Sequence, residues 1–341
     1  MMQAIAYSAE RSSREPLCLI DVELPVPSPE PHDLLVQVEA IGVNPVDAKV
    51  RRREQPPSGQ WRVLGWDAAG VVQEVGESVV GFQPGDRVWY AGALQRPGCN
   101  SRLHLVDHRL VAHRPSSLSA AAAAALPLTS ITAWELLFDR LQLHQGPQAH
   151  RGEVLLVVGA AGGVGSILVQ LASSLTGLTV VGTASRPESQ AWLQELGIQH
   201  VINHQRPMAP QLAALGIDAV QWVASLTHTD QHYEALVDVL APQGALALID
   251  DPSPEALNPL ALKRKSLSLH WELMFTRSLF GTADVAEQGR LLQRVADLVD
   301  ATVLRSTLKH ELGTINAANL REAHARIESN RSIGKLVLNG W

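Results

Sequence analysis

Residues 153–165 read EVLLVVGAAGGVG, an apolar segment that ends in closely spaced glycines. The helical pattern Ser166–Leu175 follows, and a second apolar segment, Thr179–Thr183, comes next. This spacing predicts a βαβ unit. Glycines in the first turn allow the backbone to approach a pyrophosphate, and the helix presents free N–H groups to the phosphates. A structural loop in another α/β fold is the alternative. We expect a dinucleotide site at Gly162, Gly163, Val164 and Gly165.

The end of the second predicted strand indicates which dinucleotide binds. NAD sites usually place Asp or Glu there for the ribose 2′-hydroxyl, and NADP sites carry small polar and cationic groups instead. Residues 182–187 read GTASRP, and the first carboxylate is Glu188. Arg186 can make a two-pronged contact with a 2′-phosphate, and Ser185 can donate a further hydrogen bond. The sequence favours NADPH over NADH, with a solvated arginine ahead of a helix as the alternative.

Length, charge and cysteine content limit the class of protein. A chain of 341 residues exceeds the size of one ordinary core, so we expect two domains. A net charge of −6, with no basic tract longer than 51–53, argues against nucleic acid or an anionic membrane as partner. We find no apolar run of membrane-spanning length and no signal peptide. Only two cysteines are present, which fits a reducing compartment and predicts a cytoplasmic protein.

The pattern of elements changes along the chain. Short alternating apolar segments separated by Pro and Gly run from Gln3 to Val111 and predict a β-rich region. Ser119 and the alanines after it predict a short capped helix, and Thr129–Leu141 a longer one. From Glu153 to Trp271, strands and helices alternate, which predicts an α/β fold with a doubly wound parallel sheet. Helices follow, and we expect the final strand, Lys335–Leu338, to pair with the first domain.

Five motifs carry a family resemblance that covers nearly the whole chain. They are GVNPVD at 42–47, GWDAAGVV at 65–72, PGDRV at 84–88, AAGGVG at 160–165 and GKLVL at 334–338. Together they resemble the medium-chain dehydrogenase/reductase superfamily, on its quinone oxidoreductase branch, and most of all the subgroup often labelled zinc-type alcohol dehydrogenase-like. The resemblance implies a β-rich GroES-like catalytic domain from both chain ends, with an inserted Rossmann NADP-binding domain. The expected limits are 1–127 and 275–341 for the former and 128–274 for the latter. Members of this superfamily are commonly homodimers or homotetramers.

The residues argue against zinc despite that label. A catalytic zinc needs three protein ligands, usually from Cys, His and carboxylates. In zinc-dependent relatives the ligands stand where this chain has Asn44, Trp66 and a residue near Leu128. The structural zinc of those relatives needs four clustered cysteines, and only Cys99 lies in the corresponding region. We expect no metal, and we expect His104, His108 and His113 to be solvated or satisfied histidines.

Without zinc, removal of a proton from an alcohol becomes difficult, so reduction is the expected direction. NADPH can deliver hydride to a quinone or an α,β-unsaturated carbonyl compound, where the developing charge is delocalised. The resemblance implies three catalytic candidates: Asn44 to orient a carbonyl, Asp47 to structure the loop, and Thr132 to pack against nicotinamide. A turn, a helix cap and an ordinary helical residue are the alternatives. No tyrosine follows Asn44 as it does in related reductases, which leaves Lys49 or water as the proton donor.

The resemblance also implies further cofactor contacts. His204 corresponds to a residue that helps to hold the 2′-phosphate, and Ile249 and Phe275 lie near the nicotinamide. The remaining candidates are Thr129 and Arg331. Two other functions stay open: a true zinc-type alcohol dehydrogenase, and a non-catalytic NADPH-binding or sensor protein.

Overall fold

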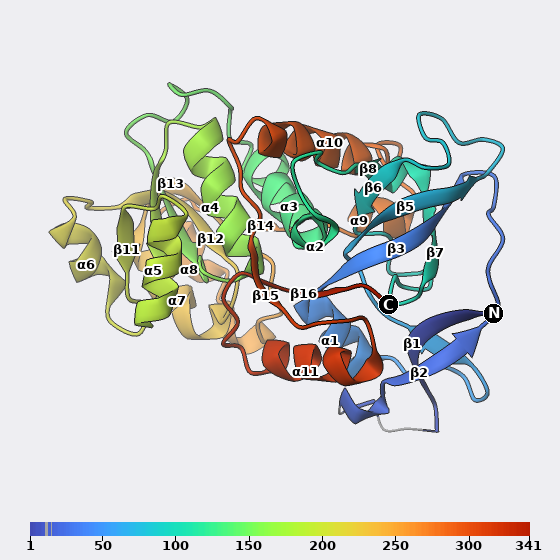
Figure 1. The fold of residues 1–341 in the computed structure, drawn as a ribbon. Coiled ribbons are helices and arrows are strands. Elements are labelled where there is room, and N and C mark those ends of the chain that lie inside the picture. The colour runs from blue at the N-terminus through green and yellow to red at the C-terminus, as the bar shows by residue number, and fades with distance from the viewer. Residues whose placement is uncertain (11–12, 15) are drawn as a thin grey trace. The chain divides into compact units, whose positions relative to one another are not determined.

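Figure 1 shows the fold as a computed structural model, which describes residues 1–10, 13–14 and 16–341. The chain forms two compact units. One comprises Met1–Ile131 together with Phe275–Trp341, and the other comprises Thr132–Met274. The two ends of the chain therefore fold together, and the middle folds as a unit of its own.

The middle unit is built on a parallel sheet of six strands in the order β11-β10-β9-β12-β13-β14. The strands are β9 (Val154–Val158), β10 (Thr179–Thr183), β11 (His200–Ile202), β12 (Val220–Ser225), β13 (Leu240–Leu248) and β14 (Ser268–Trp271). Every residue of β9 is buried, as expected for a strand covered on both faces. Leu156 of β9 pairs with Val181 on one side and Val223 on the other. The strand order reverses at β9 and β12, and open α/β sheets bind ligands at the carboxyl ends of such strands.

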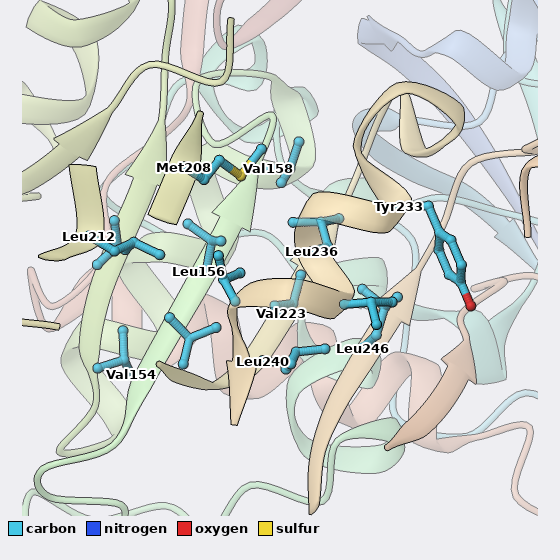
Figure 2. Packing of buried hydrophobic residues seen from close by; sticks show 14 of the residues in the cluster. Val154, Leu156, Val158, Met208, Leu212, Val223, Tyr233, Leu236, Leu240 and Leu246 are labelled. Atoms are coloured by element: carbon cyan, nitrogen blue, oxygen red, sulfur yellow. The ribbon is translucent and has the colours of Figure 1, made fainter. Parts of the chain in front are cut away.

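Helices and helical turns connect the strands of the middle unit. They are the π-helical turn η3 (Glu135–Arg140), α4 (Gly163–Leu175), α5 (Pro187–Glu195), α6 (Met208–Ala214), α7 (Thr229–Val239), the 3-10 turn η4 (Pro254–Ala256) and α8 (Leu260–Lys263). Figure 2 shows part of the resulting core, in which Met208, Leu212 and Leu236 from α6 and α7 join Leu156 and Val223 from the strands. Each such side chain contributes about 1.5–3 kcal/mol on full burial. This packing holds the strand ends at fixed positions.

The unit formed by the chain ends is rich in β-structure. Its larger sheet has the order β15-β16-β3-β5-β6-β8, with β7 paired to β3, and a smaller sheet has the order β2-β1-β4. The strands are β1 (Met2–Ser8), β2 (Ile20–Leu24), β3 (Asp33–Val43), β4 (Trp61–Val63), β5 (Ala68–Val75), β6 (Arg87–Tyr90), β7 (Leu103–Asp107), β8 (Val111–His113), β15 (Leu308–Glu311) and β16 (Lys335–Asn339). Leu338 of β16 lies opposite Ile41 of β3. The predicted pairing of the last strand with the first domain is confirmed.

Helices and 3-10 turns connect or follow these strands. They are η1 (Pro16–Cys18), α1 (Pro45–Arg53), η2 (His108–Leu110), α2 (Ala120–Ala124), α3 (Pro127–Trp134), α9 (Thr276–Phe280), α10 (Glu287–Asp300) and α11 (Ala317–Glu328). Helix α3 continues past Ile131 into the middle unit. Ser119 caps α2, with its hydroxyl accepting from the Ala122 N–H at 3.2 Å, as predicted. Helix α1 interrupts a region that we predicted to be β-rich, and it packs beside α11 (Figure 1). Asn44 with extended backbone followed by Pro45 is a favourable helix start, which explains α1.

The predicted fold class, an α/β protein with a doubly wound parallel sheet and a β-rich second unit, is confirmed. Element limits differ in detail, since α4 begins at Gly163 and not at Ser166. The predicted helix Thr129–Leu141 is observed as α3 followed by the π-helical turn η3. By length and composition, the run Ala120–Arg140 could cross a membrane, but 89% of its most apolar window is buried inside the protein. We therefore describe it as a core helix.

Candidate functional site

The glycine turn after β9 is shaped by contacts that only glycine permits. Gly165, in the first turn of α4, lies so close to the end of β9 that a Cβ would be 2.4 Å from the Gly159 carbonyl oxygen and 2.5 Å from that of Ala160. Gly159 itself has a φ of +78°, a conformation that favours glycine. Gly162 is the N-cap of α4 and has no capping side chain. The first N–H groups of α4 are thus held next to the end of β9, where they can bind phosphate oxygens.

The predicted cofactor-selecting residues lie at the end of β10. The Thr183 hydroxyl accepts from the Gly159 N–H at 3.2 Å, which joins this strand end to the glycine turn. Ser185 is half-buried, and Arg186 is the N-cap of α5. The Arg186 side chain is 29% exposed and lies 3.5 Å from the Glu188 carboxylate. A guanidinium that is partly exposed can exchange such a weak surface partner for a phosphate.

His204 follows β11 and belongs to the same group. Its Nδ1 lies 3.2 Å from the Thr183 hydroxyl. Burial lowers the pKa of His204, and the neighbouring His232, His228 and Arg186 lower it further. The structure therefore brings together the glycine turn, the end of β10 and His204, three features that sequence reasoning assigned separately.

The carboxyl edge of the sheet also carries Ile249, which directly follows β13 and is half-buried. Its neighbour Asp250 was missed by sequence reasoning. The Asp250 carboxylate accepts from the Thr229 N–H at 2.9 Å and from the Thr229 hydroxyl at 2.6 Å, so it caps the start of α7. The Asp250 carboxylate thus holds α7 at the ligand edge of the sheet.

In the unit formed by the chain ends, the main polar cluster lies at the start of α1. The Asn44 backbone N–H donates to Asp47 Oδ2 at 2.7 Å. The Asn44 side-chain amide donates to Asp67 Oδ2 at 2.8 Å. The Lys335 Nζ donates to both side chains. It lies 2.5 Å from Asn44 Oδ1 and 2.8 Å from Asp67 Oδ2. The Nζ donates a third bond to the Val43 carbonyl at 3.1 Å, so all three of its protons are used.

All four side chains of this Asn44, Asp47, Asp67 and Lys335 cluster are buried. Burial raises the pKa of Asp67, an effect that the Lys335 ammonium and the hydrogen bonds to the carboxylate oppose. Burial also raises the pKa of Asp47, to about 7, against the opposing Asn44 N–H and Lys335. Asp47 can therefore exchange a proton near neutral pH, whereas Asp67 is compensated directly by a cation.

Asp67 connects this cluster to α3. Its second oxygen accepts from the Leu128 N–H at 2.7 Å, so a carboxylate lies at the positive end of the helix that carries Thr129 and Thr132. The Thr129 hydroxyl donates to the Leu126 carbonyl at 3.0 Å. Thr132 is buried in the same helix.

Two aromatic candidates also meet in this unit. The Phe275 ring packs edge-to-face on Trp66, with 6.3 Å between centroids. Tyr90 is buried, and Trp61 is exposed. Arg331 is exposed and precedes β16.

The predicted site residues divide between the two units. The unit formed by the chain ends holds Asn44, Asp47, Thr129, Phe275 and Arg331, and the middle unit holds Thr132, the glycine turn, Ser185, Arg186, His204 and Ile249.

The donor atoms in the structure do not fit a zinc ion. Among the described residues, no three His, Cys, Asp or Glu side chains are grouped as a metal site would require. At two of the positions where zinc-dependent relatives have ligands, Asn44 Oδ1 accepts from the Lys335 ammonium and Trp66 donates its Nε1–H to the Ala93 carbonyl. The neighbouring Asp67 carboxylate also accepts from Lys335. A buried ammonium group next to these oxygens would repel a divalent cation. Cys99 lies nearby as a thiol, since burial raises its pKa.

The three histidines of the β-rich segment have ordinary partners. His104 is buried, with Nδ1 3.0 Å from the Tyr90 hydroxyl and Nε2 3.0 Å from the Pro97 carbonyl. Burial lowers its pKa to about 4, so it is neutral. His108 and His113 bond to backbone carbonyls at 3.0 and 3.3 Å.

Sequence reasoning missed Asp67 and Lys335 as site residues. Both lie in motifs that were identified, GWDAAGVV and GKLVL, and each places a charged residue in an otherwise apolar segment. A buried charge needs a partner. Two opposite charges in two apolar segments are therefore the signal that could have identified the pair.

Comparison with known proteins gives two family matches. The profile described as alcohol dehydrogenase GroES-like domain matches residues 30–112, and the one described as zinc-binding dehydrogenase matches residues 196–338. A Staphylococcus epidermidis protein named zinc-type alcohol dehydrogenase-like is 37% identical and covers 99% of both chains. A Pseudomonas aeruginosa quinone oxidoreductase is 30% identical, with 91% of this chain and 92% of that protein covered.

Solved structures agree with these matches. A Rhizobium etli protein described as a candidate zinc-dependent alcohol dehydrogenase has a TM-score of 0.94 and 52% identity, with 100% of this chain and 98% of that chain covered. A mycobacterial protein solved in complex with NADPH has a TM-score of 0.83 and 26% identity, with 99% of this chain and 100% of that chain covered.

Proposed function

Because the chain belongs to the medium-chain dehydrogenase/reductase superfamily and is an oxidoreductase of that superfamily, we propose that it is a zinc-independent, NADPH-dependent reductase. Its proposed substrates are quinones or α,β-unsaturated carbonyl compounds. The observation that carries this proposal is the carboxyl edge of the middle sheet. There the glycine turn lies beside the end of β10. Arg186 follows this strand end, and the first carboxylate after the strand is Glu188.

The choice of NADPH rests on charge. A 2′-phosphate brings a charge of about −1.5 to −2 at neutral pH, as for other phosphate monoesters. Arg186 can bind it with two parallel hydrogen bonds, and Ser185 and His204 are adjacent donors. A ribose 2′-hydroxyl, in contrast, finds no carboxylate acceptor at residues 183–187. The mycobacterial neighbour solved with NADPH supports the same choice.

We assign the remaining cofactor contacts from the family resemblance. Gly162, Gly163, Val164 and Gly165 would hold the pyrophosphate on the N-terminal turn of α4, whose N–H groups have no intrahelical partner. Thr129, Thr132, Ile249, Phe275 and Arg331 would contact the rest of the cofactor.

The choice of substrate rests on the donor atoms. NADPH supplies a hydride, and a quinone or enone can accept it without a metal because the negative charge is delocalised onto oxygen. Asn44 Nδ2 carries two protons, one of which is bonded to Asp67. We propose that the other donates to the substrate carbonyl oxygen, while Asp67 and Lys335 hold the amide in one orientation. Asp47 then acts as a positioning residue through the Asn44 N–H. Lys335 is a poor proton donor for substrate, since its three protons are already bonded.

We also propose a homo-oligomer, a dimer or a tetramer, located in the cytoplasm. Strand β14 lies at the edge of its sheet, and Trp271 and Leu273 at its end are about half exposed, at 49% and 51%. An apolar sheet edge of this kind favours pairing with another copy. Neither Cys18 nor Cys99 forms a disulfide, which fits a reducing compartment.

Binding and turnover test the proposal. Purified protein should bind NADPH at least tenfold more tightly than NADH in a fluorescence titration, as expected for one added charge-assisted contact. It should then oxidise NADPH with some members of a panel of ortho-quinones, para-quinones and enones. NADPH binding without turnover on the whole panel would favour a sensor protein. Stoichiometric zinc by elemental analysis, together with alcohol oxidation, would favour the alcohol dehydrogenase alternative.

A further inference from the structure

Three histidines gather at the carboxyl edge of the middle sheet. His204 follows β11, His228 directly precedes α7, and His232 lies one turn later on that helix. The rings of His204 and His232 pack edge-to-face, with 5.6 Å between centroids. His204 Nδ1 faces the Thr183 hydroxyl at 3.2 Å, at the end of the strand that leads to Arg186. The histidines therefore adjoin the residues that we assign to the 2′-phosphate.

The ionisable groups that act on these rings are all basic, and Arg186 is the permanent cation among them. The groups that act on His204 are His232, His228 and Arg186, and those that act on His232 include His228. Both His204 and His232 are half-buried, and burial followed by these neighbours lowers the pKa of each. In the ligand-free protein both rings are therefore neutral at physiological pH.

The acidic groups on the neighbouring elements are exposed or are bonded to other partners. Asp250 accepts from the Thr229 N–H at 2.9 Å and from the Thr229 hydroxyl at 2.6 Å, and Asp238 on α7 is exposed. Helix α6, which packs against α7 and β11, carries no charged residue. On α7, Asp230 and Glu234 are exposed, and Asp230 Oδ1 accepts from the Ser253 N–H at 2.7 Å. Glu188 lies 3.5 Å from Arg186. A bound phosphate would thus be the main anion facing the two rings.

We propose that His204 and His232 take up a proton when the 2′-phosphate binds, so that the preference for NADPH over NADH increases as the pH falls from 8 to about 6.5. This inference rests on the proposed function. A phosphate within a few ångströms favours the charged imidazolium and reverses the effect of burial and of the neighbouring cations. Of the two nitrogens of His204, Nδ1 already faces Thr183, so Nε2 is the atom that would donate to the phosphate.

Calorimetry with ligand fragments tests this directly. Adenosine 2′,5′-bisphosphate carries the 2′-phosphate, and adenosine 5′-monophosphate lacks it. Titrations between pH 6.5 and 8, in buffers with different ionisation enthalpies, give the number of protons bound with each ligand. We expect up to one proton taken up with the bisphosphate, and a roughly tenfold tighter Kd at pH 6.5 than at pH 8. The monophosphate should show a flat pH profile.

Variants assign the proton to these rings. His204→Gln and His232→Gln should each reduce the proton uptake and flatten the pH profile for the bisphosphate. His200→Gln is the matched control, because His200 starts β11 at the opposite end of the strand. It should behave as the unmodified protein does.

The possible failures are distinguishable. If the bisphosphate binds better than the monophosphate but at the same affinity at every pH, this inference is wrong and the proposed cofactor stands. Proton uptake that persists in both histidine variants also overturns it. If the bisphosphate binds no better than the monophosphate at any pH, the proposed preference for NADPH fails, and this inference fails with it.

Discussion

The Nζ of Lys335 lies 2.8 Å from Oδ2 of Asp67, and both side chains are buried, although 268 residues separate them in the sequence. The antiparallel pairing of β16 with β3 brings Lys335 to the end of β3, next to Asn44. Asp67 in turn holds the start of α3 through the Leu128 N–H. One ion pair thus connects the last strand, the loop that carries Asn44 and the helix that carries Thr129.

Removing the lysine should destabilise the protein strongly. Lys335→Met leaves the buried Asp67 carboxylate without its cation, which we expect to cost about 3–5 kcal/mol. Chemical denaturation followed by circular dichroism measures this loss. The double variant Asp67→Asn with Lys335→Met should lose less, because the Asp67 charge is removed together with its cation. The surface pair of Arg109, which is exposed, and Asp107, which is half-buried, serves as control, and Arg109→Gln should cost no more than about 1 kcal/mol.

Two glycines of the phosphate-binding turn should respond differently to alanine. Gly165→Ala places a Cβ 2.4 Å from a backbone oxygen, so α4 must move away from β9. We expect a loss of several degrees in Tm together with weaker NADPH binding. In Gly162→Ala the nearest atom lies 3.4 Å away, so Tm should change little. Equal losses of Tm in the two variants would contradict this account of the turn.

Arg186 should determine selectivity and not general affinity. Arg186→Gln removes the charge assigned to the 2′-phosphate, and we expect the Kd for NADPH to rise about 10- to 100-fold. The Kd for NADH should stay nearly constant, since NADH has no 2′-phosphate. Arg206 is exposed in the loop after β11, and Arg206→Gln is the matched control. A similar weakening of NADH binding in Arg186→Gln would argue for a structural role.

A buried pair of carboxyl groups predicts how stability depends on pH. Glu272 and Glu135 are both buried, and Arg140 Nε donates to Glu272 at 2.7 Å. Burial and the neighbouring Glu135 together raise the pKa of Glu272 to about 9, against the opposing effect of Arg140. The folded protein therefore keeps a proton that the unfolded chain releases above its ordinary pKa of 4.5. The contribution of Glu272 to the free energy of unfolding is fully present below pH 4.5 and is lost as the pH rises towards 9.

Glu272→Gln should remove this dependence, because glutamine resembles the protonated acid and does not titrate. Between pH 6 and 9 the Tm of the variant should fall less than that of the unmodified protein, by a difference on the order of a few degrees. Differential scanning calorimetry across this range provides the measurement. The exposed Glu234→Gln serves as control and should follow the unmodified protein. Parallel curves for Glu272→Gln and the unmodified protein would show that Glu272 is ionised throughout.

Features that depend on neighbouring residues could be predicted from the sequence. The apolar run of β9, the glycines after it and the capped helix α2 follow from local side-chain and backbone preferences, and all were predicted. The composition at the end of β10 is likewise local. Helix α1 was missed because its start signal, Asn44 with Pro45, also fits a turn.

The partners of the buried charges could only be decided by the tertiary structure. Asp67 pairs with Lys335, and His204 packs against His232. Glu272 lies next to Glu135 and Arg140. In each case the partners are too far apart in the sequence for a local pattern to indicate the contact. The charge and the pKa of a buried ionisable side chain depend on its burial and on its distances to other charged side chains. Those quantities arise only when sheet pairing and core packing bring the segments together, which is why sequence reasoning predicted the cofactor turn and missed the ion pair beside Asn44.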